Sequence, residues 1–316
     1  MNDFRIPLGD FVADGIDMLT ETFSPVFDLI RLIFAALYDV VEFALIAPPF
    51  WAVIVAATLI GFIVKGWKFA VGSAAGLLLI VGVNQWENAM ESLALVLVAS
   101  AIAVAISVPL GVVAARSNSA STILRPVLDF MQTMPAFVYL VPALILFRVG
   151  VVPGIVATVI FAMAPGVRLT ELGIRGVDQE VVEAGHAFGS SPWRILRQIQ
   201  LPLAMPTIMA GVNQVIMLSL SMVVIAGMVG AGGLGGDVVQ ALSRIDVGLG
   251  AEAGLSVVII AIFLDRLSAA LGGKRRGSFR LFRPRSAQTT SAPAPEPVGD
   301  TEAAAPERDT RVPARV

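Results

Sequence analysis

The sequence has 316 residues, of which 56% are hydrophobic and 15% are charged, and its mean hydropathy is +0.82. This is more apolar than a soluble domain needs to fill its core, so the composition excludes an ordinary soluble protein and indicates an integral membrane protein. We expect it to contact membrane lipid and to have no nucleic-acid partner. The chain has no cysteine, which excludes disulfides, thiolate metal sites and cysteine nucleophiles, and its net charge of −2 identifies no partner.

Residues 1–42 are predicted to form an amphipathic helix outside the membrane. Their start lacks the basic and apolar regions of a cleavable signal peptide, so we expect them in the mature protein. Acidic residues separate apolar positions that recur at steps of three and four, namely Ile16, Leu19, Phe23, Phe27, Ile30, Phe34 and Leu37. Ser24-Pro25 is expected to break this helix. We expect the segment to lie on the bilayer or against the membrane helices, with partner binding as the alternative.

Seven windows qualify as membrane-spanning helices, for which about 20 mostly apolar residues are needed. They are residues 43–64, 69–83, 92–115, 127–147, 151–167, 207–229 and 247–271. The second is short for a span, whereas the third contains no charged residue at all. The sequence therefore predicts an all-α membrane domain over residues 43–273 with about seven transmembrane helices.

The basic residues of the connections predict the orientation. One set of connections contains Lys65, Lys68, Arg116, Arg125, Arg168, Arg175, Arg194, Arg197, Lys274, Arg275 and Arg276. The opposite set is poor in them and contains Arg148 and Arg244. By the positive-inside rule the first set is cytoplasmic, so we expect a multi-pass protein of the bacterial inner or plasma membrane with its N-terminus outside. Residues 274–316 begin with basic residues and then have almost no large apolar ones, which predicts a disordered cytoplasmic tail.

Two features that could indicate enzymatic chemistry are weak. The loop 230–236 contains a formal G-x-G-x-x-G, but it follows an uncharged membrane helix instead of a strand, so we expect a turn that lets backbone segments pack closely. His186 is the chain's single histidine, and the sequence has neither a G-x-S-x-G elbow nor a G-x-x-x-x-G-K-[ST] loop. We therefore expect no catalytic residue, no metal site and no cofactor bound by this chain.

Prolines interrupt several apolar windows, at Pro109, Pro135, Pro142 and Pro165. Each removes a backbone hydrogen bond, and the freed carbonyl is tolerated within a membrane only beside other polar groups or water. Polar residues occur in two of the windows, Gln132 and Thr133 beside Pro135, and Asn213 and Gln214 in the window 207–229. Together with Pro135 they are consistent with kinked helices that line a substrate path. Hydrogen bonding that simply holds helices together is an equally good explanation.

The segment 183–202, EAGHAFGSSPWRILRQIQLP, is a charged interruption on the predicted cytoplasmic side. Residues 179–188 fit a short amphipathic helix with one side made of Val181, Val182, Gly185 and Phe188. Gly189 is expected to end it in a left-handed conformation. Ser191-Pro192 then begins a second helix, one face of which carries Trp193, Leu196 and Ile199, and Leu201-Pro202 is expected to close it. Two short helices between spans predict a contact surface for a cytoplasmic partner.

The spacing in this segment is similar to the EAA loop of permease subunits of ATP-binding-cassette (ABC) importers, E-A-A-x3-G-x9-I-x-L-P. The corresponding residues are Glu183, Ala184, Gly185, Gly189, Ile199, Leu201 and Pro202. The departure is Gly185, where the family pattern has alanine. Residues 128–267 also resemble the permease of the proline/glycine betaine (osmoprotectant) uptake system, and residues 1–42 fit that family's outer amphipathic region.

The resemblance implies the MetI-like fold of type I ABC importer permeases, with an EAA coupling loop at residues 171–203. It implies that two permease copies form the pathway, that two separate ATPase subunits dock under these loops and use ATP, and that an extracytoplasmic binding protein delivers the substrate. The substrate it implies is a quaternary ammonium compound such as glycine betaine or proline betaine. Choline or carnitine import is the alternative within this family, and an ion-coupled secondary transporter is the alternative outside it.

Overall fold

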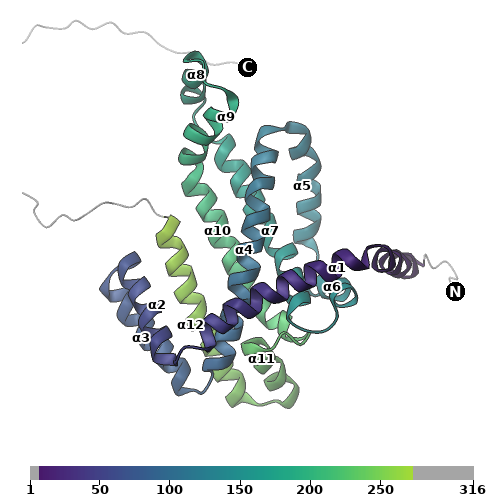
Figure 1. Ribbon diagram of the computed structural model, residues 1–316, viewed down its shortest axis with the longest axis vertical. Coiled ribbons are helices and arrows are strands. Elements are labelled where there is room, and N and C mark those ends of the chain that lie inside the picture. The colour runs from purple at the N-terminus through teal and green to yellow at the C-terminus, as the bar shows by residue number, and fades with distance from the viewer. Residues whose placement is uncertain (1–6, 273–316) are drawn as a thin grey trace, which may run out of the picture. The chain divides into compact units, whose positions relative to one another are not determined.

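The computed structural model describes residues 7–272, and the regular elements in that range are all helical (Figure 1). In chain order they are α1 (Leu8–Ile46), α2 (Phe50–Lys65), α3 (Trp67–Gly82), α4 (Trp86–Arg116), α5 (Asn118–Thr133), η1 (Ala136–Tyr139), α6 (Leu140–Phe147), α7 (Val151–Arg175), α8 (Gln179–Ala187), α9 (Pro192–Ile195), η2 (Leu196–Gln200), α10 (Leu201–Gly227), α11 (Gly233–Arg244) and α12 (Val247–Gly272). The predicted all-α class is confirmed, and the predicted tail at 274–316 lies outside the described residues.

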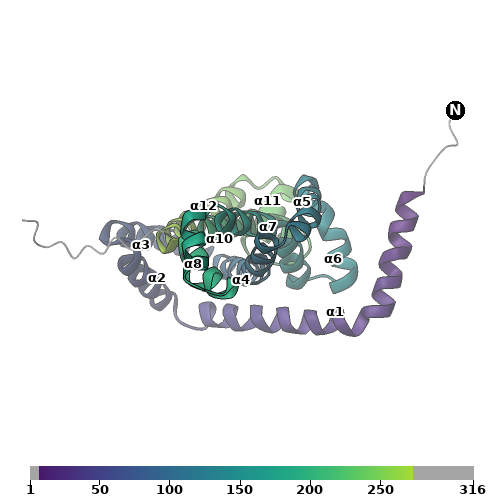
Figure 2. The ribbon, with the colours of Figure 1, turned by 90° about the horizontal axis from the view of Figure 1, so that it is seen from above.

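The first helix, α1, is long and sharply bent (Figure 2). Its backbone leaves helical geometry at Phe23, with φ −112° and ψ 17°, directly before Ser24-Pro25. The proline ring cannot fit the preceding turn and has no N–H to donate, so the predicted break is confirmed. Beyond it, α1 packs on α4, α6 and α7 and buries Tyr38, whereas Val40 and Phe43 are 68% and 72% exposed. This half of α1 therefore has one face on the other helices and a second, exposed apolar face.

The helices long and apolar enough to cross a membrane are fewer than the seven windows. Within residues 7–272, four qualify alone, namely α4, α7, α12 and the continuous helix Pro192–Gly227, and the bent pairs α1–α2 and α5–α6 raise the number to at most six. The remaining window is α3, whose 16 residues extend about 24 Å, less than the roughly 30 Å of a hydrocarbon core. The expected seven spans are thus not reproduced by helix length.

Small residues bring α4, α7 and α10 into close contact. A Cβ added to Gly111 of α4 would lie 2.7 Å from the carbonyl oxygen of Val167 in α7. A Cβ on Gly166 of α7 would lie 2.4 Å from Ser107 Oγ of α4, and one on Gly211 of α10 would lie 3.6 Å from the Gly166 Cα. In a bilayer, such backbone proximity and the dispersion contacts it allows replace the hydrophobic effect as the force between helices. These three helices therefore form the close-packed centre of the described protein.

The glycine-rich loop between α10 and α11 is a close-packed turn, as predicted. Gly230, Gly232 and Gly233 have positive φ values of 82°, 73° and 62°, which glycine adopts without steric cost. The Gly233 N–H donates to the Glu91 carboxylate at 2.7 Å, and the Leu234 N–H donates to Ser92 Oγ at 2.8 Å. Two side chains of α4 thus bind the free N–H groups at the start of α11.

Two adjacent glycines of this loop should respond differently to alanine. A Cβ on Gly235 would lie 2.1 Å from the carbonyl oxygen of Val223, whereas one on Gly236 has no neighbour within 4 Å. We expect Gly235→Ala to destabilise the protein by about 1–3 kcal/mol, because neither backbone can move freely, and Gly236→Ala to be neutral. Thermal unfolding of both purified variants measures the difference. Equal midpoints would contradict the close contact between α10 and α11.

Candidate functional site

The segment between α7 and α10 begins with the short helix α8, which has a defined start and end. Asp178 is the N-cap, and its carboxylate accepts a hydrogen bond from the Glu180 N–H at 3.0 Å. At the other end the Ser190 N–H donates to the Gly185 carbonyl at 3.1 Å, and the Gly189 N–H donates to the His186 carbonyl at 2.9 Å. This bond pair is a Schellman motif, and Gly189 has the left-handed φ of 74° that it requires. The predicted left-handed end of the helix at Gly189 is confirmed.

The second helix of the segment starts as predicted but does not end as predicted. Ser191 is the N-cap, its Oγ accepts from the Arg194 N–H, and Pro192 occupies the first turn. The chain then remains helical through a π turn at Leu196–Gln200 into α10, so the expectation that Leu201-Pro202 closes the helix is wrong. Pro202 lies in the first turn of α10. The preceding π turn changes the hydrogen-bond register, so the missing N–H of Pro202 is tolerated there. The second helix is therefore a direct extension of α10.

The two short helices pack against each other at a glycine. A Cβ on Gly185 would lie 3.0 Å from Ile199 Cδ1 and 3.3 Å from Ile195 Cγ1, so this position, where the EAA pattern has alanine, lies directly on the second helix. Leu196 is 1% exposed and clusters with Ile174 of α7 and Ala204 of α10. The segment is thereby joined to the ends of both long helices.

The set of exposed side chains in this segment differs from the set that helical periodicity predicts. Glu183, Ala184, Gly189 and Pro202 are exposed, and Ile199 and Leu201 are partly buried. Phe188 and Trp193, which the pattern places on the apolar sides of the two short helices, are 90% and 59% exposed. Helical periodicity does not hold for Phe188, because it is the C-cap residue at the start of the Schellman turn. Exposed aromatic residues are typical of interaction sites.

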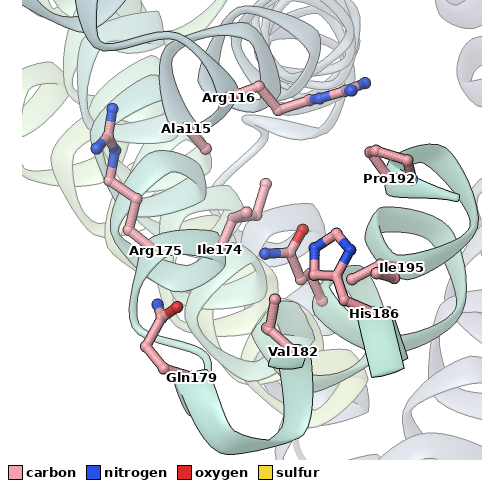
Figure 3. A pocket seen from close by; sticks show the side chains of 10 residues that line it. Ala115, Arg116, Ile174, Arg175, Gln179, Val182, His186, Pro192 and Ile195 are labelled. Carbon is pink, nitrogen blue, oxygen red and sulfur yellow. The ribbon is translucent and has the colours of Figure 1, made fainter. Parts of the chain in front are cut away.

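A cleft of about 450 Å³ separates α8 from the ends of α4 and α7 (Figure 3). Val182 and His186 of α8 point into it toward Ile174 of α7, and Arg116 of α4 lies at its rim. His186 thus lines a gap between helices and is no part of a metal cluster among the residues that the structure describes.

Arg175 also lines this cleft, and next to it a buried carboxylate joins α5 and α7 and, through Arg175, α4. Glu171 of α7 accepts hydrogen bonds from Ser121 Oγ at 2.7 Å and Arg125 Nη2 at 2.9 Å, and Arg175 Nε lies 3.0 Å from the same oxygen. Arg175 also donates to the Asn118 side chain at 2.9 Å and to the Ala114 carbonyl at 2.8 Å. Sequence analysis did not identify this cluster, because its members lie up to 61 positions apart.

The residues predicted to line a substrate path have different surroundings. Gln132, Thr133 and Pro135 are exposed at the end of α5, where the chain bends by 107° into α6. Asn213 of α10 donates to Asp265 Oδ1 of α12 at 3.4 Å and accepts from Ser268 Oγ. This favours the helix-joining explanation for Asn213. The neighbouring Gln214 is exposed.

Sequence comparisons link the chain to transport proteins. Residues 107–277 match the family described as binding-protein-dependent transport system inner membrane component. The chain is 48% identical over 275 residues to the glycine betaine/carnitine transport permease protein GbuB of Listeria monocytogenes, covering 86% of this chain and 97% of the relative. It is 46% identical over 279 residues to the glycine betaine/proline betaine permease protein ProW of Escherichia coli, covering 88% and 79%. It is 45% identical over 274 residues to the glycine betaine permease protein OpuAB of Bacillus subtilis, covering 86% and 96%.

Structure comparisons agree on the fold. The inward-facing methionine ABC transporter MetNI superimposes with a TM-score of 0.55 at 20% identity, covering 60% of this chain and 94% of that chain. A second crystal form gives a TM-score of 0.54, with 58% and 91% covered. At this identity the likeness concerns the fold alone, and it confirms the expected MetI-like permease fold.

Proposed function

Because the chain belongs to the family of binding-protein-dependent transport system inner membrane components, we propose that it is the permease subunit of an ABC importer for glycine betaine, proline betaine or a related quaternary ammonium compound. The observation that supports this substrate class is 45–48% identity over nearly nine-tenths of the chain to permeases of such compounds. In this family the ATPase is a separate subunit, so the chain is no enzyme. ATP would be bound by that subunit and not here.

The segment α8 to η2 is proposed as the coupling element on which the ATPase docks. Glu183, Ala184 and Gly189 would lie at the contact, and Phe188 and Trp193 would insert into the partner. Gly185, Ile199, Leu201 and Pro202 would hold the two short helices together and to α10. Since η2 continues directly into α10, a displacement of α8 and α9 reaches α10 and, through its close contact with α7, the bundle centre. This continuous connection would couple a movement of the docked ATPase to alternating access of the membrane helices.

The family implies an ATPase and an extracytoplasmic binding protein as partners in a multi-pass assembly of the inner membrane. We further propose two permease copies, two ATPase subunits and the orientation predicted from the basic connections, with the coupling element and C-terminus cytoplasmic and the N-terminus outside. This requires α3 to cross as a short span beside α2. Local thinning of the bilayer accommodates a helix of that length at modest cost.

The substrate path is proposed to pass the bend between α5 and α6. Pro135 lies at this bend, where the Tyr139 hydroxyl donates to the Met131 carbonyl, and Gln132 and Thr133 are exposed beside it. Gln214 of α10 is also exposed and would line the path, whereas Asn213 would position α12 through Asp265 and Ser268. A zwitterionic substrate needs few strong contacts here, because the binding protein would supply most of the selectivity with aromatic cages.

Uptake of labelled substrate tests the proposed function. The permease, its ATPase and its binding protein are expressed in a host without betaine uptake, and glycine betaine, carnitine and choline are compared. We expect glycine betaine uptake that stops when the ATPase is omitted or its nucleotide site is inactivated. Preference for carnitine, which the relative from Listeria monocytogenes also has in its name, would support the alternative substrate. Uptake that persists without the ATPase and collapses with the ion gradient would contradict the ABC mechanism.

A further inference from the structure

A cavity of about 220 Å³ lies where α1 meets the turn between α6 and α7, at the opposite end of α7 from the coupling element. On one side it is lined by Arg31, Tyr38 and Asp39 of α1, and on the other by Phe147 of α6 and residues 149–153. Pockets for drug-sized ligands enclose about 300–1,000 Å³, so this cavity suits a smaller molecule. In the proposed orientation it belongs to the extracytoplasmic side.

Two aromatic rings and a carboxylate suit this cavity to an organic cation. Tyr38 and Phe147 are both buried, and Phe147 is held by an edge contact with Phe27, whose ring centroid lies 5.7 Å away. Asp39 is exposed and forms no salt bridge with any residue that the structure describes. Aromatic rings bind quaternary ammonium groups through the negative charge of their faces, and a nearby carboxylate adds to this attraction.

The same cavity has unused donors for an anion. Arg31 is partly buried, and its guanidinium pairs with no carboxylate of residues 7–272. The N–H groups of Val151 and Val152, at the start of α7, donate to no backbone carbonyl or capping side chain in the described chain. A guanidinium binds a carboxylate through two parallel hydrogen bonds, and the start of a helix favours negative charge. The cavity therefore offers binding groups for both ends of a zwitterion.

We propose that this cavity binds a quaternary ammonium carboxylate such as glycine betaine, at a site separate from the proposed path at the α5–α6 bend; the choice of ligand rests on the proposed function. The trimethylammonium group would lie against Tyr38 and Phe147 near Asp39, and the carboxylate would bind Arg31 and the start of α7. Arg31 and Asp39 together give the cavity no net charge, which matches a zwitterion. Seven residues separate Arg31 from Tyr38, or about 10.5 Å along the helix, a length that the ligand and the long arginine side chain span together.

Ligand binding to the purified permease–ATPase complex, without ATP or the binding protein, tests this inference. Labelled glycine betaine, choline and glycine are compared by equilibrium dialysis in phosphatidylglycerol nanodiscs, which contain no choline headgroup. We expect glycine betaine to bind most tightly, because choline lacks the carboxylate and glycine lacks the methyl groups that favour an aromatic surface. Equal binding of glycine betaine and glycine would overturn the proposal.

Two charge variants separate the contributions of the two ends. Arg31→Gln should weaken glycine betaine binding about tenfold and leave choline binding unchanged, because only glycine betaine has a carboxylate. Asp39→Asn should weaken the binding of both about threefold, because both carry the ammonium group. The matched controls are Arg244→Gln on α11 and Asp28→Asn on α1, which are exposed and do not line the cavity, and they should change neither.

The outcomes distinguish this site from the alternatives. Glycine betaine binding that Arg31→Gln leaves unchanged would overturn the proposal and indicate binding in the path. A retained phosphatidylcholine without any bound glycine betaine, detected by native mass spectrometry, would assign the cavity to a lipid headgroup and also overturn it. Uptake by the complete system is measured in parallel. ATP-dependent uptake of glycine betaine without binding at this cavity would overturn this inference alone, whereas absence of uptake would contradict the proposed function.

Discussion

Gly189→Pro is expected to abolish ATP-driven uptake while the protein still inserts into the membrane. Gly189 has a φ of 74°, and its N–H closes the Schellman turn at the end of α8. Proline fixes φ near −65° and has no N–H, and it also disfavours the helical conformation of the preceding Phe188. The turn that positions α8 against the second helix would therefore not form. Uptake of labelled glycine betaine by membrane vesicles, normalised to the amount of inserted permease, measures the effect.

Two further variants distinguish a broken turn from a lost contact. Gly189→Asn should keep most of the uptake, because asparagine adopts the left-handed conformation and retains the N–H. Glu183→Lys leaves the turn intact but reverses a charge on the exposed side of α8, so it should abolish both uptake and co-purification of the ATPase. Wild-type uptake by Gly189→Pro or Glu183→Lys would show that this segment does not couple the two subunits.

Glu171→Ala should lower the stability of the permease by about 1–3 kcal/mol, the usual cost of leaving buried hydrogen-bond donors without their acceptor. The Glu171 side chain is 7% exposed and holds Ser121, Arg125 and Arg175 around one oxygen. Without it, the Ser121 hydroxyl and the Arg175 guanidinium lose their anionic partner at the junction of α4, α5 and α7. The thermal unfolding midpoint of the purified protein in detergent reports the loss.

The exposed ion pair of the same region is the matched control. Asp129 and Arg168 also join α5 to α7, but their side chains are 64% and 38% exposed. Exposed pairs contribute about 0–1 kcal/mol, so Asp129→Asn should leave the midpoint nearly unchanged. Glu171→Gln should fall between the two, because the amide oxygen still accepts one hydrogen bond. Equal shifts for Asp129→Asn and Glu171→Ala would mean that burial of the carboxylate does not determine its contribution.

The sequence by itself determined the class of the protein and the local form of its coupling element. Long apolar windows predict membrane helices because each helix satisfies its own backbone within about 20 residues. Likewise, Gly189 and Ser191-Pro192 specify a helix end and a helix start from residues only a few positions apart. Such local interactions can be read along the chain. Pro25 and the glycine loop at 230–236 were predicted for the same reason.

Only the tertiary structure decided which residues meet across the helices. The Glu171 cluster and the cap that Glu91 gives to α11 depend on helices far apart in sequence. Tertiary geometry also decided that Phe188 points outward and that the helix continues through Leu201-Pro202 into α10. Helical periodicity gives the faces of one helix but neither its neighbours nor its end geometry. Those are determined by the close approach of glycines such as Gly111, Gly166 and Gly185, whose partners no local pattern identifies.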